Sequence, residues 1–278
     1  MLSIVVICIS IVLLVIIVRF NIVYAYENAV KSIWNNNGET RMLKVNTEDK
    51  AFEPTLDYNI NNASIIVDAI VRVEKATENN TEPLDPVGFT KEGSYKVNGG
   101  NTFAVIWSKG RDVMIALRAT NGSWEIKQDL DISHAQFGGS NVHQGFLNVY
   151  SEFRNELIEK VSTLTFDRIF VGGHSLGGSI VPLVCSDLRQ YNICGYSFGA
   201  PRTGDEFFKE LVSNLSIYRV YNENDQFVYM PPTVAPNIKN PSSPLKYTHC
   251  GTGVSFDLNY GYVQLNHSIV TYSDFINS

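Results

Sequence analysis

The stretch Gly172-Gly173-His174-Ser175-Leu176-Gly177-Gly178 constrains the fold of this chain more than any other segment. It lies between an apolar run predicted as a strand, residues 168–172, and an apolar run predicted as a helix, residues 176–190. A serine in a Gly-x-Ser-x-Gly pattern at this position occupies a strained turn, and the glycines avoid clashes between strand and helix. The hydroxyl then points out of the sheet, close to the N–H groups of the helix N-terminus. We therefore interpret Ser175 as a candidate nucleophile.

The alternative for this turn is a Gly-rich loop that binds phosphate. Such loops carry Gly-Lys-Ser or Gly-Lys-Thr, or a Gly-x-Gly-x-x-Gly pattern that opens a helix. The sequence contains neither pattern. The turn is therefore better explained by nucleophilic chemistry than by phosphate binding.

Strands and helices alternate in the second half of the chain, which predicts βαβ units, a mostly parallel central sheet flanked by helices, and hence an α/β fold. A hairpin is expected first, with strands at 102–107 and 112–118. Residues 63–73 fit either a helix or a strand, and residues 26–100 indicate no function. The further predicted strands are 168–172, 193–198 and 217–221, and the predicted helices are 149–161, 176–190 and 205–215.

Composition excludes several classes of protein. The net charge is -6, and no two basic residues are adjacent, so we expect neither a nucleic-acid partner nor a polybasic membrane patch. Hydrophobic residues make up 44% of the chain, which excludes a disordered protein. Cys185, Cys194 and Cys250 form no Cys-x-x-Cys pattern, so no metal site is expected. Their odd number leaves at least one thiol unpaired within residues 26–278.

The extreme N-terminus is uniformly apolar. Residues 2–18 carry no charge and end at Arg19. This length lies between a signal-peptide core and a membrane span. We predict a signal peptide over residues 1–25, cleaved after Ala25, and a single domain over 26–278. The alternative is a membrane anchor. Secretion would make glycosylation possible at five Asn-x-Ser/Thr sites: Asn62, Asn79, Asn121, Asn214 and Asn266.

A nucleophilic serine needs a base and an orienting acid, and in α/β-hydrolases these follow it in the order acid, then histidine. His249 and His267 both follow Ser175, and position alone favours His267. Asp225 is the preferred acid because it follows a predicted strand, where α/β sites are built. Asp205 competes but is also suited to cap a helix. Glu223 and Asp257 are weaker candidates.

Several ordered segments across residues 102–276 together resemble the class 3 (fungal-type) lipase family of the α/β-hydrolases. Each segment is weak alone, but their common order is specific. The matching segments are Ile115-Ala116-Leu117-Arg118-Ala119-Thr120, Val142-His143-Gln144-Gly145-Phe146, Gly173 to Gly178, Ser197-Phe198-Gly199-Ala200-Pro201-Arg202-Thr203-Gly204-Asp205, Asn224-Asp225 before Met230-Pro231-Pro232, Tyr247-x-His249-x-Gly251, and Asn266-His267 with Tyr272.

The resemblance implies Ser175 as nucleophile, Asp225 as acid and His267 as base, with His249 in a structural position. It implies that Thr120 and Leu176 form the oxyanion hole. No metal or organic cofactor is required. The implied function is a secreted triacylglycerol lipase that meets its lipid ester substrate at a lipid–water interface. The alternatives are a phospholipase A1, a mono- or diacylglycerol lipase, a feruloyl-type esterase, or a catalytically inactive binding protein of the same fold.

The chain departs from the family pattern beside the oxyanion hole. Ala119 replaces the usual glycine, and its Cβ restricts φ. A family lid over the site would correspond to residues 121–141, whose Gly138-Gly139 pair is either a hinge or a turn. The sequon at Asn266 adjoins His267, so we predict that Asn266 carries no glycan.

Overall fold

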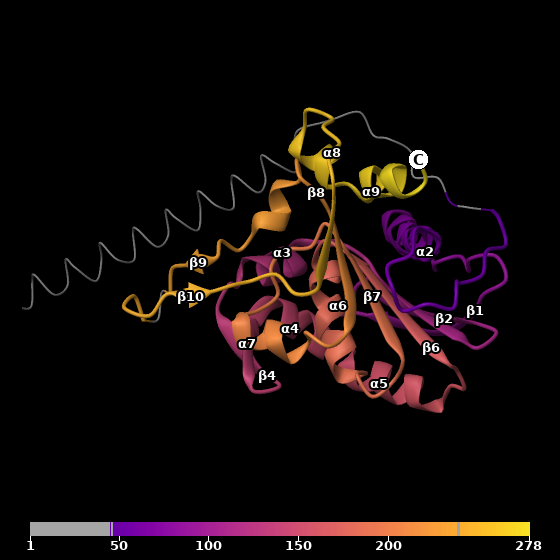
Figure 1. Cartoon of the computed structure of the whole chain (residues 1–278), viewed down its shortest axis with the longest axis horizontal. Coiled ribbons are helices and arrows are strands. Elements are labelled where there is room, and N and C mark those ends of the chain that lie inside the picture. The colour runs from indigo at the N-terminus through magenta and orange to yellow at the C-terminus, as the bar shows by residue number, and fades with distance from the viewer. Residues whose placement is uncertain (1–44, 46, 238–239) are drawn as a thin grey trace, which may run out of the picture.

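The computed structural model describes residues 45, 47–237 and 240–278. A seven-stranded sheet forms its centre, in the order β1-β2-β3-β6-β7-β8-β11 (Figure 1). The first three strands pair antiparallel, and β3, β6, β7, β8 and β11 are parallel neighbours. The predicted α/β fold with a mostly parallel sheet is therefore confirmed. The strands are β1 (Thr90–Lys96), β2 (Thr102–Lys109), β3 (Asp112–Leu117), β6 (Arg168–His174), β7 (Ile193–Phe198), β8 (Ser216–Asn222) and β11 (Thr252–Phe256).

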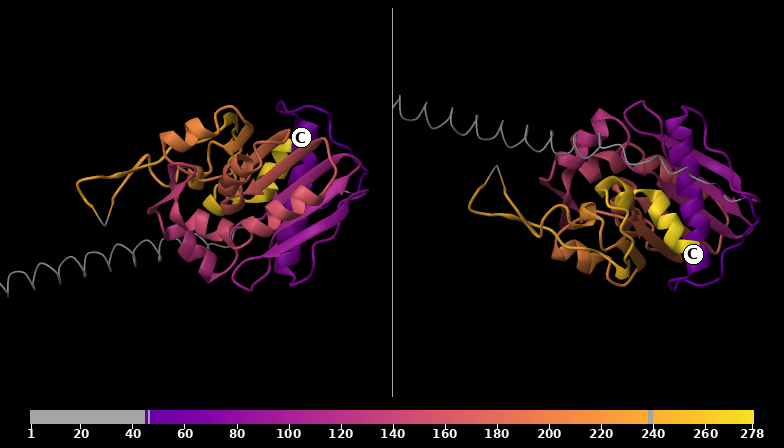
Figure 2. Two further views of the ribbon diagram at one scale, coloured as in Figure 1. Left: turned by 90° about the horizontal axis from the view of Figure 1, so that it is seen from below. Right: turned by 90° about the horizontal axis from the view of Figure 1, so that it is seen from above.

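Helices cover both faces of this sheet (Figures 1 and 2). α2 and α9 pack together on one face, against a core that includes Phe170 and Tyr196. α4, α5 and α6 cover the other face, where Val171 and Ile180 are buried. The helices are α2 (Ile60–Glu78), α3 (Ser123–Leu130), α4 (Gln144–Ser151), α5 (Arg154–Thr163), α6 (Leu176–Asp187), α7 (Glu206–Leu211), α8 (Val263–His267) and α9 (Ile269–Ile276), with a 3₁₀ turn η1 (Gln226–Tyr229).

α2 shows why the sequence of residues 63–73 was ambiguous. Its buried residues include the apolar Ala63, Ile66, Ile70 and Val73, and also the polar Asn62. The helix contacts β2, β3 and β6 on one side and α9 on another. Residues 63–73 are all buried except Asp68, so this part of the helix has no clear polar face and no clear helical period.

The single helix predicted over residues 149–161 is wrong. The chain forms α4 and α5 there, separated at Glu152 and Phe153. The Phe153 ring lies 5.6 Å from the Phe103 ring and 5.5 Å from the Tyr150 ring. The apolar residues at helical spacing thus reach one core, although the helix is interrupted at Glu152 and Phe153.

Two small sheets lie beside the main one. β4 (His134–Phe137) and β5 (Ser140–His143) form a hairpin, and β9 (Val234–Ala235) pairs with β10 (Leu245–Lys246). Gly138 and Gly139 join β4 to β5 with φ of 59° and 84°. Such left-handed pairs are typical of two-residue hairpin turns, so the Gly-Gly pair is a turn in this structure.

The predicted signal peptide lies outside the described residues, and the boundary at residue 25 stays a prediction. In the part of the chain that the structure covers, no helix combines the length and apolarity needed to cross a membrane. Cys185, Cys194 and Cys250 are buried free thiols. Burial raises the pKa of Cys194 and of Cys250 to about 12.

Candidate active site

Ser175 occupies the turn between β6 and α6 with φ 53° and ψ −117°. This left-handed conformation is uncommon for a residue with a side chain, and backbone strain of this kind is concentrated at functional sites. A Cβ on Gly173 would collide with the Gly177 carbonyl oxygen, and one on Gly177 would collide with the Leu117 carbonyl oxygen. The two glycines of the motif are therefore needed because strand and helix approach closely.

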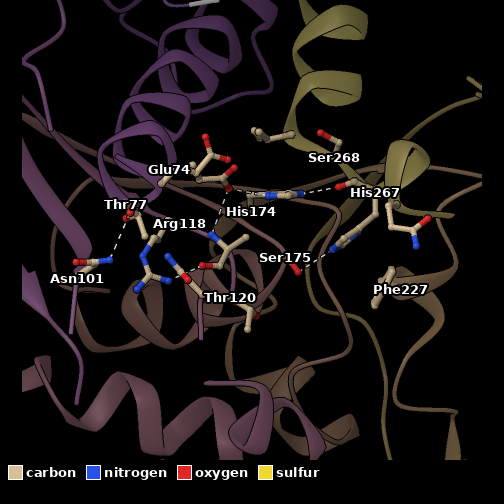
Figure 3. Close-up of a pocket in the computed structure, with 15 residues that line it drawn as sticks. Glu74, Thr77, Asn101, Arg118, Thr120, His174, Ser175, Phe227, His267 and Ser268 are labelled. Carbon is tan, nitrogen blue, oxygen red and sulfur yellow. Dashed lines mark hydrogen bonds and ion pairs between the residues drawn. The ribbon is translucent and has the colours of Figure 1, made fainter. Parts of the chain in front are cut away.

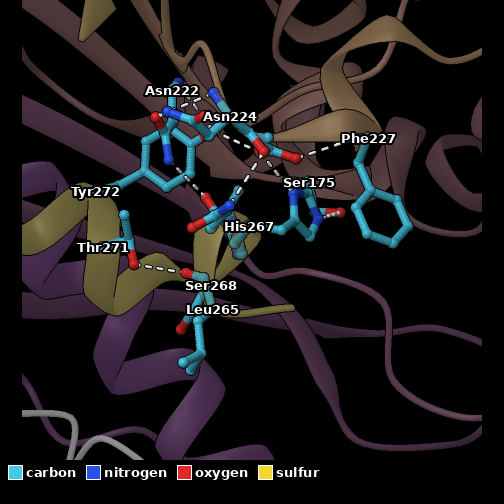
Figure 4. A network of polar contacts seen from close by, with 12 residues as sticks. Ser175, Asn222, Asn224, Phe227, Leu265, His267, Ser268, Thr271 and Tyr272 are labelled. Carbon is cyan, nitrogen blue, oxygen red and sulfur yellow. Dashed lines mark hydrogen bonds and ion pairs between the residues drawn. The ribbon is translucent and has the colours of Figure 1, made fainter. Parts of the chain in front are cut away.

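Ser175, His267 and Asp225 form a continuous hydrogen-bonded chain (Figure 4). Ser175 Oγ lies 2.8 Å from His267 Nε2, and His267 Nδ1 lies 2.7 Å from Asp225 Oδ2. Ser175 follows β6, Asp225 follows β8, and His267 ends α8. Because parallel strands end at one edge of a sheet, residues 50 positions apart meet there. This geometry can transfer a proton from serine to imidazole.

Further contacts hold the acid and the imidazole in place. Asp225 is fully buried, and its Oδ2 accepts a 2.6 Å hydrogen bond from Tyr272 Oη. The Phe227 N–H donates to Asp225 Oδ1 at 2.9 Å, and the Phe227 ring stacks on His267 with centroids 4.3 Å apart. Burial, and the Asp225 carboxylate, raise the pKa of Tyr272, so its hydroxyl stays a donor. Tyr272 is thus part of the site's hydrogen-bonded network.

Thr120 and Leu176, which are predicted to form the oxyanion hole, both line the apolar cavity at Ser175. Leu176 begins α6, and the first N–H groups of a helix have no intrahelical acceptor. The Thr120 Oγ1 donates to Asp129 Oδ2 at 2.7 Å, so the hydroxyl is already engaged. Burial raises the pKa of Asp129 to about 7, although the hydrogen bond from Thr120 acts in the opposite direction. The roles of Thr120 and Leu176 as oxyanion-hole donors stay predictions.

Ala119 adopts an ordinary backbone conformation. Among the described residues, φ is positive at only three non-glycine positions: Asn80, Asn98 and Ser175. The Ala119 N–H donates to Glu74 Oε1 at 3.3 Å. The restriction that its Cβ places on φ is thus satisfied, and the loop still brings Thr120 to the edge of the site.

The segment predicted as a lid is tied to the sheet by a buried ion pair. Arg118, after β3, makes two hydrogen bonds of 2.7 and 2.8 Å to Glu125 of α3. Their exposed fractions are 1% and 4%. The Glu125 carboxylate also accepts the Asn121 N–H at 2.7 Å. The segment's role as a lid stays a prediction.

Two cavities meet at the candidate nucleophile, and Thr120, Ser175, Phe227 and His267 line both. One is mostly apolar, with a volume of about 220 Å³. The other is lined mainly by polar residues and has a volume of about 520 Å³ (Figure 3). The apolar cavity is lined further by Ile126, Asp129, Leu130, Ile132, His143, Phe146, Leu176, Pro201, Gln226, Met230, Pro231 and Val263.

The competing residues lie elsewhere. Asp205 caps α7, because its Oδ1 accepts the Phe208 N–H at 3.0 Å. Burial lowers the pKa of His249 to about 3, and Arg219 and Arg202 act in the same direction. A histidine that is held neutral beside two cations, and that has no hydrogen bond to a carboxylate of the described residues, is poorly suited as the base. Glu223 and Asp257 are exposed.

Sequence reasoning missed a second histidine at the site. His174 Nδ1 lies 2.8 Å from Glu74 Oε1 of α2, and His174 Nε2 lies 2.7 Å from the His267 carbonyl oxygen (Figure 3). Both partners only accept, which requires a proton on each ring nitrogen. Burial lowers the pKa of His174, but Glu74 and the His267 carbonyl raise it overall. The one available signal was the position of His174 next to Ser175.

The described residues include no group of three or more His, Cys, Asp or Glu side chains that could hold a metal ion. The absence of a metal or cofactor stays a prediction.

A strained serine after a parallel strand, beside a histidine and a buried aspartate that follow in chain order, defines the α/β-hydrolase class. Residues 114–235 match the family "Lipase (class 3)". The predicted resemblance to this family is confirmed.

Similar proteins agree with this assignment. A lipase of Rhizomucor miehei is 35% identical over 114 residues, 36% of this chain and 31% of the relative. A secreted mono- and diacylglycerol lipase of Fusarium solani is 33% identical over 105 residues, 34% of this chain and 31% of the relative. The rice phospholipase A1-II 3 is 29% identical over 169 residues, 46% of this chain and 39% of the relative. The chain thus spans less than half the length of these relatives.

Solved structures share the fold. The native Rhizomucor miehei lipase propeptide complex has a TM-score of 0.55 at 22% identity, covering 72% of this chain and 69% of that one. Lipase II from Rhizopus niveus has a TM-score of 0.56 at 19% identity, covering 70% and 79%.

Proposed function

We propose that this chain is a serine carboxylic ester hydrolase that acts on lipid esters. The observation that carries the proposal is the hydrogen-bonded chain from a strained Ser175 through His267 to a buried Asp225, at 2.8 and 2.7 Å. The names of the relatives support it: a lipase, a mono- and diacylglycerol lipase and a phospholipase A1.

The proposed mechanism is acyl transfer. His267 Nε2 accepts the Ser175 proton as Oγ attacks the ester carbonyl carbon, and Asp225 stabilises the imidazolium. The C–O bond to the alcohol then breaks as His267 returns the proton to the leaving oxygen. Water, activated by His267, next attacks the acyl-enzyme, which releases the acid and restores the Ser175 hydroxyl.

The N–H groups of Thr120 and Leu176 would stabilise the oxyanion that forms in each half of the reaction. Loss of one such donor typically costs about 2.7–4 kcal/mol of transition-state stabilisation. The apolar cavity of about 220 Å³ suits the acyl chain, because an acyl chain bound there is removed from contact with water.

Among lipid esters, triacylglycerol is the expected substrate. Phospholipids, partial glycerides and feruloyl-type esters are the alternatives. A panel of these esters, assayed with wild type and Ser175→Ala, tests the proposal. We expect turnover of at least one lipid ester and nearly complete loss in the variant. Normal turnover by Ser175→Ala would refute the assignment.

The non-enzymatic alternative is a binding protein with an inactive hydrolase fold. A fluorophosphonate probe, which reacts with activated serines, separates the two. Covalent labelling of Ser175, found by peptide mass spectrometry, supports the enzyme. A chain that binds lipid esters but is not labelled supports the binding protein.

We also propose that the enzyme is secreted, with residues 2–18 as the core of a cleaved signal peptide. N-terminal sequencing of exported protein should begin at Tyr26. Recovery of residues 2–18 in a membrane fraction together with active enzyme would instead support the anchor.

A further inference from the structure

The proposed mechanism leaves unused the second cavity beside Ser175, which is lined mainly by polar residues and which we call the head-group chamber. Its volume is about 520 Å³, more than twice that of the apolar cavity. Ser175, His267 and Thr120 line both cavities, so a tetrahedral carbon on Ser175 lies between them. An acyl chain in the apolar cavity directs the alcohol portion of the ester into the chamber.

The chamber is lined with groups that hydrogen-bond hydroxyls. Glu74, Thr77 and Glu78 lie three and four residues apart on α2, and therefore on one face of that helix. Carboxylates accept hydrogen bonds, and carboxamides both accept and donate. Figure 3 shows Asn101 and Thr77 across the chamber from Ser268. The carboxamide and hydroxyl side chains on the wall are Asn101, Asn121, Gln264 and Ser268, together with Thr77 and Thr120, whose hydroxyls already donate within the protein.

The charges on the chamber wall are mostly compensated. Arg118 lines the chamber, but its guanidinium is 1% exposed and is paired with Glu125. Glu74 is paired with His174. Glu78 is exposed. Partial burial and the nearby Glu74 raise the pKa of Glu78, and Lys75 lowers it. When it is ionised, the Glu78 carboxylate at this wall repels an anionic group.

We propose that the head-group chamber is a subsite for an uncharged, hydroxyl-rich alcohol, such as the glycerol of a monoacylglycerol or the sugar of a glycolipid. The inference rests on the proposed ester hydrolysis, and within it favours an ester with one acyl chain over the triacylglycerol that the family resemblance implies. The two acyl chains of a diacylglycerol leaving group would leave the polar wall unpaired, which is costly. A phosphodiester would face Glu78 with no free cation on the wall to balance it.

Octanoate esters of four alcohols test the inference at constant acyl chain: ethanol, glycerol, choline and glycerol 3-phosphate. In wild type we expect kcat/KM for the glycerol ester to exceed that for the ethyl ester by about tenfold or more, because a site built to bind hydroxyls rejects analogues that lack them. The phosphorylated ester should be the poorest. Equal values for glycerol and ethyl esters overturn the proposal, and the highest value for the choline ester shows a cation site instead.

Two variants locate the effect. Gln264→Leu should lower the ratio of glycerol to ethyl ester kcat/KM about tenfold. Glu78→Gln should lower the ratio of glycerol to phosphorylated ester about tenfold, by removing the like charge. Glu159→Gln, which changes an exposed carboxylate of α5 outside the chamber, is the matched control and should move neither ratio. Unchanged ratios in both chamber variants overturn the proposal.

A binding experiment distinguishes failure of this inference from failure of the proposed function. Calorimetry with Ser175→Ala compares 1-O-octylglycerol, which has no ester bond, with octyl phosphate. Tighter binding of octylglycerol, weakened by Gln264→Leu, supports the chamber even if no ester is hydrolysed. Hydrolysis of all four esters without preference, with equal binding of both ligands, leaves the esterase intact and refutes the subsite.

Discussion

His174 and Glu74 form a buried pair, 2.8 Å apart, directly behind the candidate triad. The pair connects two loops of the site. Glu74 Oε1 accepts the Ala119 N–H beside Thr120, and His174 Nε2 donates to the His267 carbonyl. α2 thereby orders both the oxyanion loop and the segment that carries the base.

Glu74→Gln should lower kcat about tenfold, because it loosens both loops without touching the reacting atoms. It should also destabilise the fold in a pH-dependent way. A raised folded pKa of His174 means that the pair's contribution is fully present below the unfolded value and is lost as pH rises through the folded value. Melting temperatures should differ most near pH 5.5 and least above the folded pKa.

The control for this substitution is Glu82→Gln, an exposed carboxylate with no partner in the described structure. Its melting temperature should follow wild type at every pH. A wild-type minus Glu74→Gln difference that grows with pH would contradict a cationic His174.

Tyr272→Phe should lower kcat/KM about tenfold, because a hydrogen bond to a charged group contributes about 1.5–3 kcal/mol. The hydroxyl donates to Asp225 at 2.6 Å, and its loss leaves that carboxylate less well oriented toward His267. Steady-state kinetics should place the loss mainly in kcat. Tyr262→Phe, at an exposed tyrosine, is the matched control. A loss confined to KM would argue against orientation of the acid.

Asp129→Asn should stabilise the fold more at pH 8 than at pH 5. Shielding raises the folded pKa of Asp129 to about 7, so stability falls as pH rises from the unfolded value through 7, where the folded carboxyl ionises. The asparagine removes this charge and can still accept the Thr120 hydroxyl. Melting temperatures at the two pH values provide the measurement. An equal shift at both would show that Asp129 is already ionised at pH 5.

Glu125→Gln should destabilise the fold by about 3–5 kcal/mol, because it leaves the buried Arg118 charge unpaired. Urea unfolding followed by circular dichroism measures the change. Asp167→Asn breaks an exposed pair with Arg111 and should have no measurable effect. Similar small effects of both substitutions would show that water reaches Arg118.

In a host that glycosylates, Asn62 and Asn266 should remain unmodified. Both side chains are buried, with exposed fractions of 0% and 6%. Asn79, Asn121 and Asn214 are exposed and accessible to the transferase. Glycopeptide mass spectrometry of active protein tests this. A glycan on Asn266 of active enzyme would refute the prediction made from sequence.

The parts of the candidate site that depend on short sequence segments were predictable. Ser175 could be found because a strained strand-to-helix turn needs glycines within two residues of the serine. Resemblance to a family then selected Asp225 and His267, which spacing alone had left open against Asp205 and His249. The structure separates these pairs physically, because Asp205 caps a helix and His249 lies beside two arginines.

Two features could not be read from the chain. The break between α4 and α5 depends on where Phe153 meets Phe103, 50 residues earlier. The role of Glu74 depends on His174, 100 residues later. The residues around Glu74 in the sequence do not indicate which distant side chain it will contact.

The amino-acid sequence was sufficient for the turn at Ser175, the α/β alternation and the family, because these depend on conformational preferences of residues close together in the chain. Packing of α2 against the sheet was needed to place Glu74 against His174 and to build the wall of the head-group chamber. Those contacts depend on how distant segments pack around a common core. Hydrophobic attraction is non-directional, so no local sequence pattern indicates which distant segments will meet.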